Sequence, residues 1–279
     1  MINALTIDVE EYFQVTAFSA VVKEEAWGNY PSRAKESVLK TLELLDEFYV
    51  KGTFFVLGWV AERYPGIVRE IHARGHEVAS HGYSHKLIYN LGERKFREDL
   101  KRGKKLLEDI CQENVLGYRA PSYSITKKSL WALDILMEEG FLYDSSIFPI
   151  FHDIYGMPHA ERFPHEINRP CGTIKEFPLS TIELKFLGMK YRLPVAGGGY
   201  LRLLPIGISK RAIKGINDNE KQPAVLYFHT WEIDPAQPRI KGGWKSGFRH
   251  YFNLDKTAGR VKDILSSFKF APMREILGF

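Results

Sequence analysis

The first half of the chain alternates short apolar runs with amphipathic stretches, and this alternation limits the folds that it can form. Apolar runs rich in β-branched and aromatic residues predict strands at 4–8, 53–58, 77–81, 115–121 and 141–146. Charged stretches with helical periodicity lie between them and predict helices at 32–52, 66–75, 93–111 and 127–140. Strands that alternate with helices form a parallel sheet with helical crossovers. The first half therefore predicts an α/β fold.

The second half departs from this alternation after about residue 150. Residues 174–200 hold Pro and Gly among β-type runs, which predicts strands and turns inserted in the scheme. A strand at 224–234 and a helix at 255–268 then return to it. The 279 residues show no linker and no internal repeat, and α/β barrels commonly use about 200–250 residues as one domain. We therefore predict a single domain over residues 1–279.

Composition and charge exclude several classes of protein. Hydrophobic residues make up 44% of the chain and charged residues 26%, and the formal net charge is only +5. The densest basic run, 93–105, carries interleaved acids and predicts a solvated helix face rather than a nucleic-acid site. The N-terminus lacks signal-peptide features, no apolar run could span a membrane, and Cys111 and Cys171 show neither metal nor disulfide spacing. We expect a cytoplasmic protein.

Two carboxylates follow the first predicted strand on a single face. In the stretch "LTIDVE", three aliphatic residues alternate with Thr6, Asp8 and Glu10. A period of two places the two carboxylates on one face of the strand and the aliphatic side chains on the other. Polar residues at the carboxyl ends of barrel strands lie where active sites are built. The alternative is a strand that runs out into solvent, where acidic side chains are tolerated.

Other chemically active side chains follow other predicted strands, and they are His81, His85, Arg119, Tyr123, Asp144 and His229. A His-x-x-x-His pair lies one turn apart on a helix, so that both rings can reach a single point. Two ligands leave a zinc site incomplete, and a lone strand histidine is usually a packed core residue. The recurrence of such residues at successive strand ends favours one common site with Asp8 and Glu10.

These residues resemble the motifs of the polysaccharide deacetylases of carbohydrate esterase family 4, which share the NodB-homology domain. The Thr-Phe-Asp-Asp, His-Ser/Thr-x-x-His, Arg-x-Pro-x-Tyr and Leu-x-His motifs of that family are similar to "TIDVE", "HGYSH", "RAPSY" and "YFH". The fourth family motif, an Asp followed by a Trp, is present only as Asp144. Similarity in "DVEEYFQV", "GGGYLRLLP" and "HTWEIDP" extends to the subgroup encoded with exosortase-type exopolysaccharide loci.

The resemblance implies a fold and a cofactor. It implies a distorted (β/α) barrel with a NodB-homology core at about 1–235 and a C-terminal extension at about 236–279. It also implies a divalent metal, often zinc, held by Glu10, His81 and His85. The metal-binding Asp of the family directly follows the catalytic Asp, and Val9 occupies that place here. We assign the ligand to Glu10 because strand alternation puts it on the face of Asp8.

The resemblance also implies an activity, which is removal of acetyl groups from N-acetylated sugars of a polysaccharide or of its lipid-linked precursor. Asp8 would be the general base, and Arg119 would keep it ionised and oriented. The backbone N–H of Tyr123 would stabilise the oxyanion. His229 would protonate the departing amine, and Asp144 would tune the site or contact the substrate. Lipid-linked intermediates would fit a protein that is peripheral at the inner membrane.

Two other functions remain open at the level of sequence. Allantoinase-like enzymes, which hydrolyse cyclic amides without a metal, are similar around residues 77–82 and carry Glu in the first motif. They generally lack the second histidine, so that His85 favours the metal enzyme. A non-catalytic carbohydrate-binding relative is the other alternative, since residues 242–252 mix aromatic and basic side chains that could stack on sugars. A packed C-terminal segment is the simpler interpretation of residues 242–252.

Overall fold

The computed structural model describes residues 1–152, 154–186, 189–195 and 197–279. The strands are β1 (Ile2–Val9), β2 (Thr53–Val56), β3 (Glu77–Ser80), β4 (Gly117–Tyr118), β5 (Tyr143–Asp144), β6 (His165–Arg169), β7 (Gly172–Glu176), β8 (Thr181–Phe186), β9 (Met189–Pro194), β10 (Val225–His229) and β11 (Lys269–Ala271). The longer helices are α1 (Ala34–Glu47), α3 (Pro65–Ala73), α5 (Glu93–Cys111), α6 (Trp131–Glu138), α8 (Ile206–Asp218), α9 (Trp244–Tyr251) and α10 (Thr257–Leu265). Shorter helical segments are η1 (Thr16–Phe18), η2 (Glu24–Asn29), α2 (Gly58–Arg63), α4 (Ile88–Leu91), η3 (Pro121–Tyr123), α7 (Gly198–Leu203), η4 (Thr230–Ile233), η5 (Leu254–Lys256) and α11 (Met273–Leu277).

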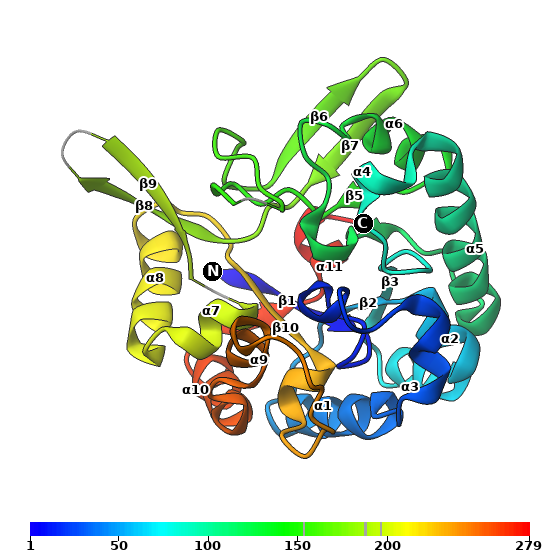
Figure 1. Cartoon of the computed structure of the whole chain (residues 1–279). Helices are drawn as coiled ribbons and strands as arrows, with labels where there is room; N and C mark the ends of the chain where they lie inside the picture. The colour runs from blue at the N-terminus through cyan, green and yellow to red at the C-terminus, as the bar shows by residue number, and fades with distance from the viewer. Residues whose placement is uncertain (153, 187–188, 196) are drawn as a thin grey trace.

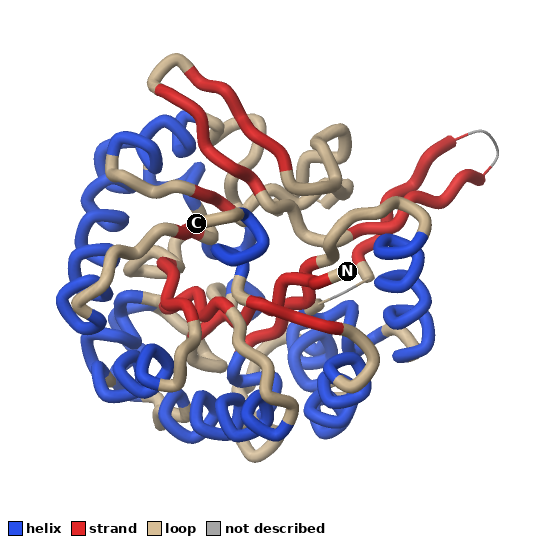
Figure 2. The backbone as a smooth tube through the Cα atoms, turned by 180° about the vertical axis from the view of Figure 1, so that it is seen from behind, coloured by secondary structure: helices blue, strands red, loops and turns tan. Residues whose placement is uncertain are grey.

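Nine of the described strands form a strongly curved, mainly parallel sheet surrounded by helices, and β8 and β9 form a separate antiparallel hairpin (Figures 1 and 2). The order of the sheet is β10-β1-β2-β3-β4-β5-β7-β6, with β11 paired to β1 and with β6 antiparallel to β7. The pairs from β10 to β7 are all parallel. Because the carboxyl ends of parallel strands meet at one end of a barrel, the predicted strand-end residues are brought together. The α/β class and the distorted barrel predicted above are confirmed.

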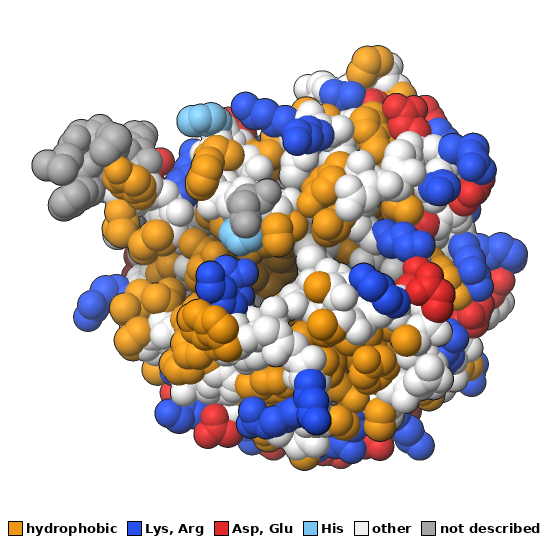
Figure 3. Space-filling view, viewed as in Figure 1, with side chains coloured by type: hydrophobic (Ala, Val, Ile, Leu, Met, Phe, Trp, Pro, Cys, Tyr) orange, Lys and Arg blue, Asp and Glu red, His pale blue; other side chains and the backbone are white. Residues whose placement is uncertain are grey.

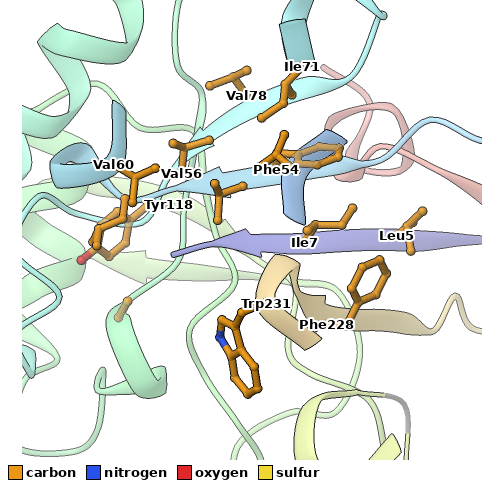
Figure 4. Close-up of a cluster of buried hydrophobic side chains, with 14 of the residues drawn as sticks. Leu5, Ile7, Phe54, Val56, Val60, Ile71, Val78, Tyr118, Phe228 and Trp231 are labelled. Carbon is orange, nitrogen blue, oxygen red and sulfur yellow. The ribbon is translucent and has the colours of Figure 1, made fainter. Parts of the chain in front are cut away.

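Strand β1 separates two hydrophobic clusters by simple alternation. Leu5, Ile7 and Val9 point outward into the large cluster between sheet and helices, where Figure 4 shows Leu5 and Ile7 with Phe54. Ala4 points into the smaller cluster inside the barrel. Full burial of each aliphatic side chain contributes about 1.5–3 kcal/mol. These contacts fix the register of β1, and the register directs Asp8 to the barrel interior.

The helix predicted at 93–111 is α5, with the same bounds. Its buried positions, spaced three or four residues apart, face the sheet, and they are Phe96, Leu100, Gly103, Leu107 and Cys111. On the exposed face, Arg94 pairs with Glu98 and Lys105 pairs with Asp109, each four residues along the helix. This is the solvated face that the interleaved charges predict.

The second half supplies two hairpins and closes the bottom of the barrel. The predicted inserted strands correspond to β7, β8 and β9, although residues 187, 188 and 196 of that stretch lie outside the described residues. The backbone N–H of Met273, at the start of α11, donates to Thr53 Oγ1 over 2.7 Å and so fixes α11 under the sheet. Within the described ranges, no helix combines the length and apolar character that crossing a bilayer requires.

Candidate active site

A pocket of about 370 Å³ opens at the carboxyl ends of β1, β3 and β10. It appears as the central hollow in Figure 3. Asp8, Glu10, His81, His85 and His229 all line it. Residues from three segments that are far apart in the sequence therefore meet at one site.

Asp8, which lines this pocket, is held by a buried arginine. The distance from Arg119 Nη1 to Asp8 Oδ1 is 2.8 Å, and the arginine is completely buried. Its other guanidinium nitrogens donate to the carbonyl and hydroxyl oxygens of Ser145, so that the side chain cannot rotate away. Burial lowers the pKa of Arg119, but the carboxylate of Asp8 raises it by more, so that the net pKa lies above its ordinary value. Arg119 therefore holds the side chain of Asp8 in a fixed orientation.

Glu10, His81 and His85 form a candidate metal centre. One ligand atom from each lies within 4.8 Å of the others. His81 Nδ1 donates to the carbonyl oxygen of Arg119 over 2.8 Å, which leaves Nε2 as the acceptor. Burial lowers the pKa of His81 to about 4, so that its ring is neutral at pH 7. A carboxylate and two imidazoles are a donor set that suits zinc in an open, catalytic site.

Glu10 is directed toward the two histidines in the way that strand alternation predicts. The distance from Glu10 Oε2 to His85 Nε2 is 2.6 Å, and Trp231 Nε1 donates to Glu10 Oε1 over 3.1 Å. Burial raises the pKa of Glu10, but His85 lowers it more, so that the net pKa is below the usual range. Val9 is buried in the large outer cluster and points away from the site.

The two histidines converge through a loop, and the helical turn suggested by their spacing is absent. Residues 81–87 are loop, and Gly82 (φ 72°) and His85 (φ 52°) adopt left-handed backbone conformations. Asp99 of α5 fixes this loop by accepting the backbone N–H groups of Tyr83 and Ser84 over 2.7 and 3.0 Å. Sequence reasoning missed Asp99 because its role depends on contact between α5 and a distant loop.

Tyr123 lines the pocket, but its backbone N–H is already engaged. It donates to the carbonyl oxygen of Ala120 over 2.9 Å within η3. The predicted oxyanion contact would therefore have to share or replace this bond. The ring packs edge-on against Phe148, Tyr155 and Tyr227, which makes Tyr123 part of the aromatic wall of the pocket.

His229 approaches the carboxylate oxygen of Asp8 that Arg119 does not contact. Its Nε2 is 3.8 Å from Asp8 Oδ2 and 3.7 Å from Glu10 Oε1, and its side chain is 20% exposed. Trp231, which belongs to η4 and does not continue the strand as expected, stacks on the imidazole with ring centroids 5.1 Å apart. The ring is thus held with Nε2 toward the reacting centre.

Glu232, which the sequence interpretation did not single out, orients His229. Its Oε2 lies 2.9 Å from His229 Nδ1 and accepts the His229 backbone N–H over 2.9 Å, while Arg202 Nε donates to its Oε1 over 2.6 Å. Burial raises the pKa of Glu232, but Arg202 and His229 lower it to about 2. For His229 the directions are reversed: burial lowers its pKa, but Glu232 raises it to about 9. The signal in the sequence was a Glu three residues after a strand end, which is capping-box spacing.

Asp144 lies outside the pocket, which speaks against the predicted substrate contact, whereas its predicted tuning role stays a prediction. It is fully buried in β5, where Ser146 Oγ donates to its Oδ1 over 2.5 Å. It is not among the residues that line the pocket. Burial raises the pKa of Asp144 to about 6, although a hydrogen bond with Glu176 acts to lower it. A substrate cannot reach it, and Glu232 occupies the position beside His229 that a tuning residue requires.

We expect Glu232→Gln to lower hydrolysis by about 10- to 100-fold, which is the equivalent of one charge-assisted hydrogen bond. Because Glu232 raises the pKa of His229, its loss lowers that pKa. His229 then loses its proton at a lower pH. The alkaline limb of the pH–rate profile therefore moves toward neutrality. The profile of Asp144→Asn is the control and should keep its limb. A shift in Asp144→Asn without one in Glu232→Gln would restore the original assignment.

Two family models match adjoining parts of the chain. The model described as Polysaccharide deacetylase matches residues 28–136, and the one described as Domain of unknown function (DUF3473) matches residues 145–278. A peptidoglycan-N-acetylglucosamine deacetylase of Bacillus cereus is 32% identical over 96 residues, or 34% of this chain and 35% of that protein. A chitooligosaccharide deacetylase of Sinorhizobium fredii is 34% identical over 98 residues, or 35% of this chain and 43% of that protein. The chain thus spans less than half the length of these relatives.

Solved structures extend the likeness over almost the whole chain at lower identity. A probable polysaccharide deacetylase from Pseudomonas aeruginosa PAO1 has a TM-score of 0.63 at 16% identity and covers 99% of this chain and 89% of its own. Puue allantoinase has a TM-score of 0.59 at 17% identity and covers 99% of this chain and 88% of its own. At such identities the likeness shows the fold alone, and that fold is the predicted barrel.

Proposed function

We propose that this chain, which carries a polysaccharide deacetylase domain, removes acetyl groups from N-acetylated sugars of a polysaccharide or of its lipid-linked precursor. The observation that carries the proposal is the convergence of a carboxylate base, a histidine acid and a metal-ligand triad in one pocket. The names of the matched relatives, which act on peptidoglycan and chitooligosaccharides, support the choice of substrate. We also propose a place in the subgroup encoded with exosortase-type exopolysaccharide loci.

A divalent ion, with zinc as the first candidate, would be held by Glu10, His81 and His85. When bound there, it would act as a Lewis acid on the acetyl carbonyl and would make water more acidic. The buried donor set and the orientation of His81 by Arg119 fit such an ion.

The protein side chains supply the proton transfers. Asp8 takes a proton from the attacking water, and Arg119 holds its carboxylate in place. Water adds to the acetyl carbon, and the bond from that carbon to nitrogen then breaks to give acetate and a free sugar amine. His229 delivers a proton from Nε2 to the departing nitrogen, and Glu232 holds the opposite ring nitrogen. Trp231 and Tyr227 wall the pocket beside the sugar.

The allantoinase-like alternative shares the fold but receives less support from the site. That alternative needs no metal, whereas His85 lies 2.6 Å from Glu10 and completes a three-ligand set here. A non-catalytic binding relative is likewise disfavoured, since Asp8, Arg119 and His229 are all in place.

The test of the proposed function is the leaving-group dependence of His229→Ala. A sugar amine leaves poorly without a proton, while the phenolate of an activated aryl acetate leaves readily. We therefore expect the variant to slow an N-acetylated sugar by about 10²-fold or more, the usual contribution of a positioned acid. Hydrolysis of the aryl acetate should fall far less. Acetate release and phenol absorbance measure the two reactions.

Metal content provides the control for this variant. His229 is not one of the three proposed ligands, so that elemental analysis should give the same metal content as for the unmodified chain. Equal losses on both substrates with full metal content would contradict the acid role and would make His229 a binding or structural residue.

A further inference from the structure

The segment around α9 carries a local excess of positive charge. Residues 235–254 contain four basic side chains and no acidic one, and the four are Arg239, Lys241, Lys245 and Arg249. The formal net charge of the entire chain is only +5. Charge elsewhere in the chain is largely balanced, and this segment is therefore a distinct basic surface.

Helix α9 packs through one face and exposes aromatic rings on the other. His250 is buried and stacks on Trp231, with centroids 4.1 Å apart, which anchors the helix beside the pocket. On the outer face, Trp244 is 78% exposed and Phe248 is 50% exposed. They lie four residues apart and thus on the same side of the helix. The interpretation of this segment as fully packed is wrong for these two rings.

We call Trp244, Phe248, Lys241 and Lys245 the α9 surface, and it adjoins the mouth of the catalytic pocket. Arg249, which follows Phe248, lines the pocket together with Leu203, which is 46% exposed. Figure 3 shows hydrophobic side chains gathered over α7 and α9 beside the hollow, with basic side chains next to them.

The opposite rim of the pocket has a similar character. Phe151 is 89% exposed and is followed by His152, which lines the pocket. Lys127 and Lys128 are exposed and line a neighbouring depression together with Phe151. Apolar and basic side chains therefore occur on both sides of the opening.

We propose that the α9 surface docks on an anionic lipid bilayer and so turns the catalytic pocket toward the membrane. Aromatic rings insert favourably at the level of lipid headgroups, and nearby Lys and Arg side chains are attracted to anionic lipids. A neutral sugar chain is a poorer occupant, because its hydroxyl groups need acceptors as well as donors. The α9 surface offers cationic donors and rings, without a carboxylate or a side-chain amide.

This orientation gives the lipid-linked form of the substrate a physical basis. A pocket that faces the bilayer can receive a sugar that is anchored in the bilayer. Soluble sugar chains are less well placed to enter it. Only this consequence rests on the proposed function, since the docking itself can be measured without catalysis.

The test is flotation of the full chain with vesicles of phosphatidylcholine alone or mixed with phosphatidylglycerol. We expect binding to the mixed vesicles only, with weaker binding at higher salt. Trp244→Ser with Phe248→Ser, and separately Lys241→Glu with Lys245→Glu, should each weaken binding about 10-fold or more. The controls are Tyr49→Ser and Lys95→Glu, which change an exposed ring in the turn after α1 and an exposed lysine of α5 and should leave binding unchanged.

Activity on a water-soluble N-acetylated oligosaccharide separates this proposal from the proposed function. The Trp244→Ser/Phe248→Ser variant should keep that activity while losing vesicle binding. Failure of the unmodified chain to bind mixed vesicles, or equal binding by all variants, would overturn the docking proposal. Displacement from the vesicles by a soluble acidic polysaccharide that binds the α9 surface would also overturn it and would make the surface a sugar site.

Discussion

Asp8→Asn should fold and retain its metal but lose hydrolysis by about 10²-fold or more. Asparagine has the shape of aspartate and can still accept a hydrogen bond from Arg119, but it cannot take a proton from water. Because Asp8 Oδ1 lies 2.8 Å from a completely buried guanidinium, the loss of its charge also weakens a charged hydrogen bond. We expect the free energy of unfolding to fall by about 1.5–3 kcal/mol.

The measurement is turnover of an N-acetylated oligosaccharide together with metal content and a thermal unfolding curve. Folded protein with full metal and little turnover is the expected combination. Near-normal turnover would show that another group is the base, and Glu10 would be the first suspect, since its Oε1 lies 3.7 Å from His229 Nε2. The conservative variant Glu25→Gln, which changes an exposed carboxylate of η2, controls for a general effect of removing a carboxylate.

The parts of the fold that local pattern determines could be predicted from the sequence. Helix α5 has the bounds that its periodicity indicates, and β1 points its aliphatic side chains and Asp8 in the expected directions. Pairing between distant segments leaves no such local signal. The sequence did not indicate that β7 would join the sheet beside β5, or that α11 would close the bottom of the barrel.

The residues of the candidate site also differ in how far the sequence could predict them. Asp8, Glu10, His81 and His229 were identified because each lies near the carboxyl end of a predicted strand, and the parallel sheet brings them to one pocket. Arg119 was identified in the same way, and it contacts Asp8. Asp144 also follows a strand, but its side chain enters the buried interior beside Glu176. The position of a residue at a strand end therefore says where its backbone lies, whereas the neighbours decide what its side chain contacts.

Glu232 and Arg202 show the converse case. Glu232 lies three residues from His229 in the chain, but its partner Arg202 comes from α7, and the pair forms only when α7 packs against η4. Sequence spacing could suggest the first contact and could not suggest the second. The electrostatic state of His229 depends on both.

Removal of either histidine of the candidate metal centre should abolish tight metal binding and most activity. His81→Ala and His85→Ala each leave two of the three proposed ligands. Loss of an outer-shell partner already lowers metal affinity or activity by about 10- to 100-fold, so that loss of a direct ligand should exceed this range. Elemental analysis of dialysed protein and turnover at saturating metal measure the two effects, and His159→Ala, which changes an exposed histidine, is the matched control.

The same measurements on a Glu10 variant test whether Glu10, and not the residue at position 9, supplies the carboxylate ligand. Glu10→Gln keeps the size of the side chain and its contact with Trp231 but removes the negative charge, and it should weaken metal binding as the histidine variants do. A metal that stabilises only the folded state also raises the unfolding temperature, so that zinc should stabilise the unmodified chain and not these variants. Full metal occupancy in His81→Ala or His85→Ala would exclude this ligand set. Full occupancy in Glu10→Gln alone would leave the two histidines as ligands and would require another oxygen donor, with Asp8 the nearest carboxylate on the same face of β1.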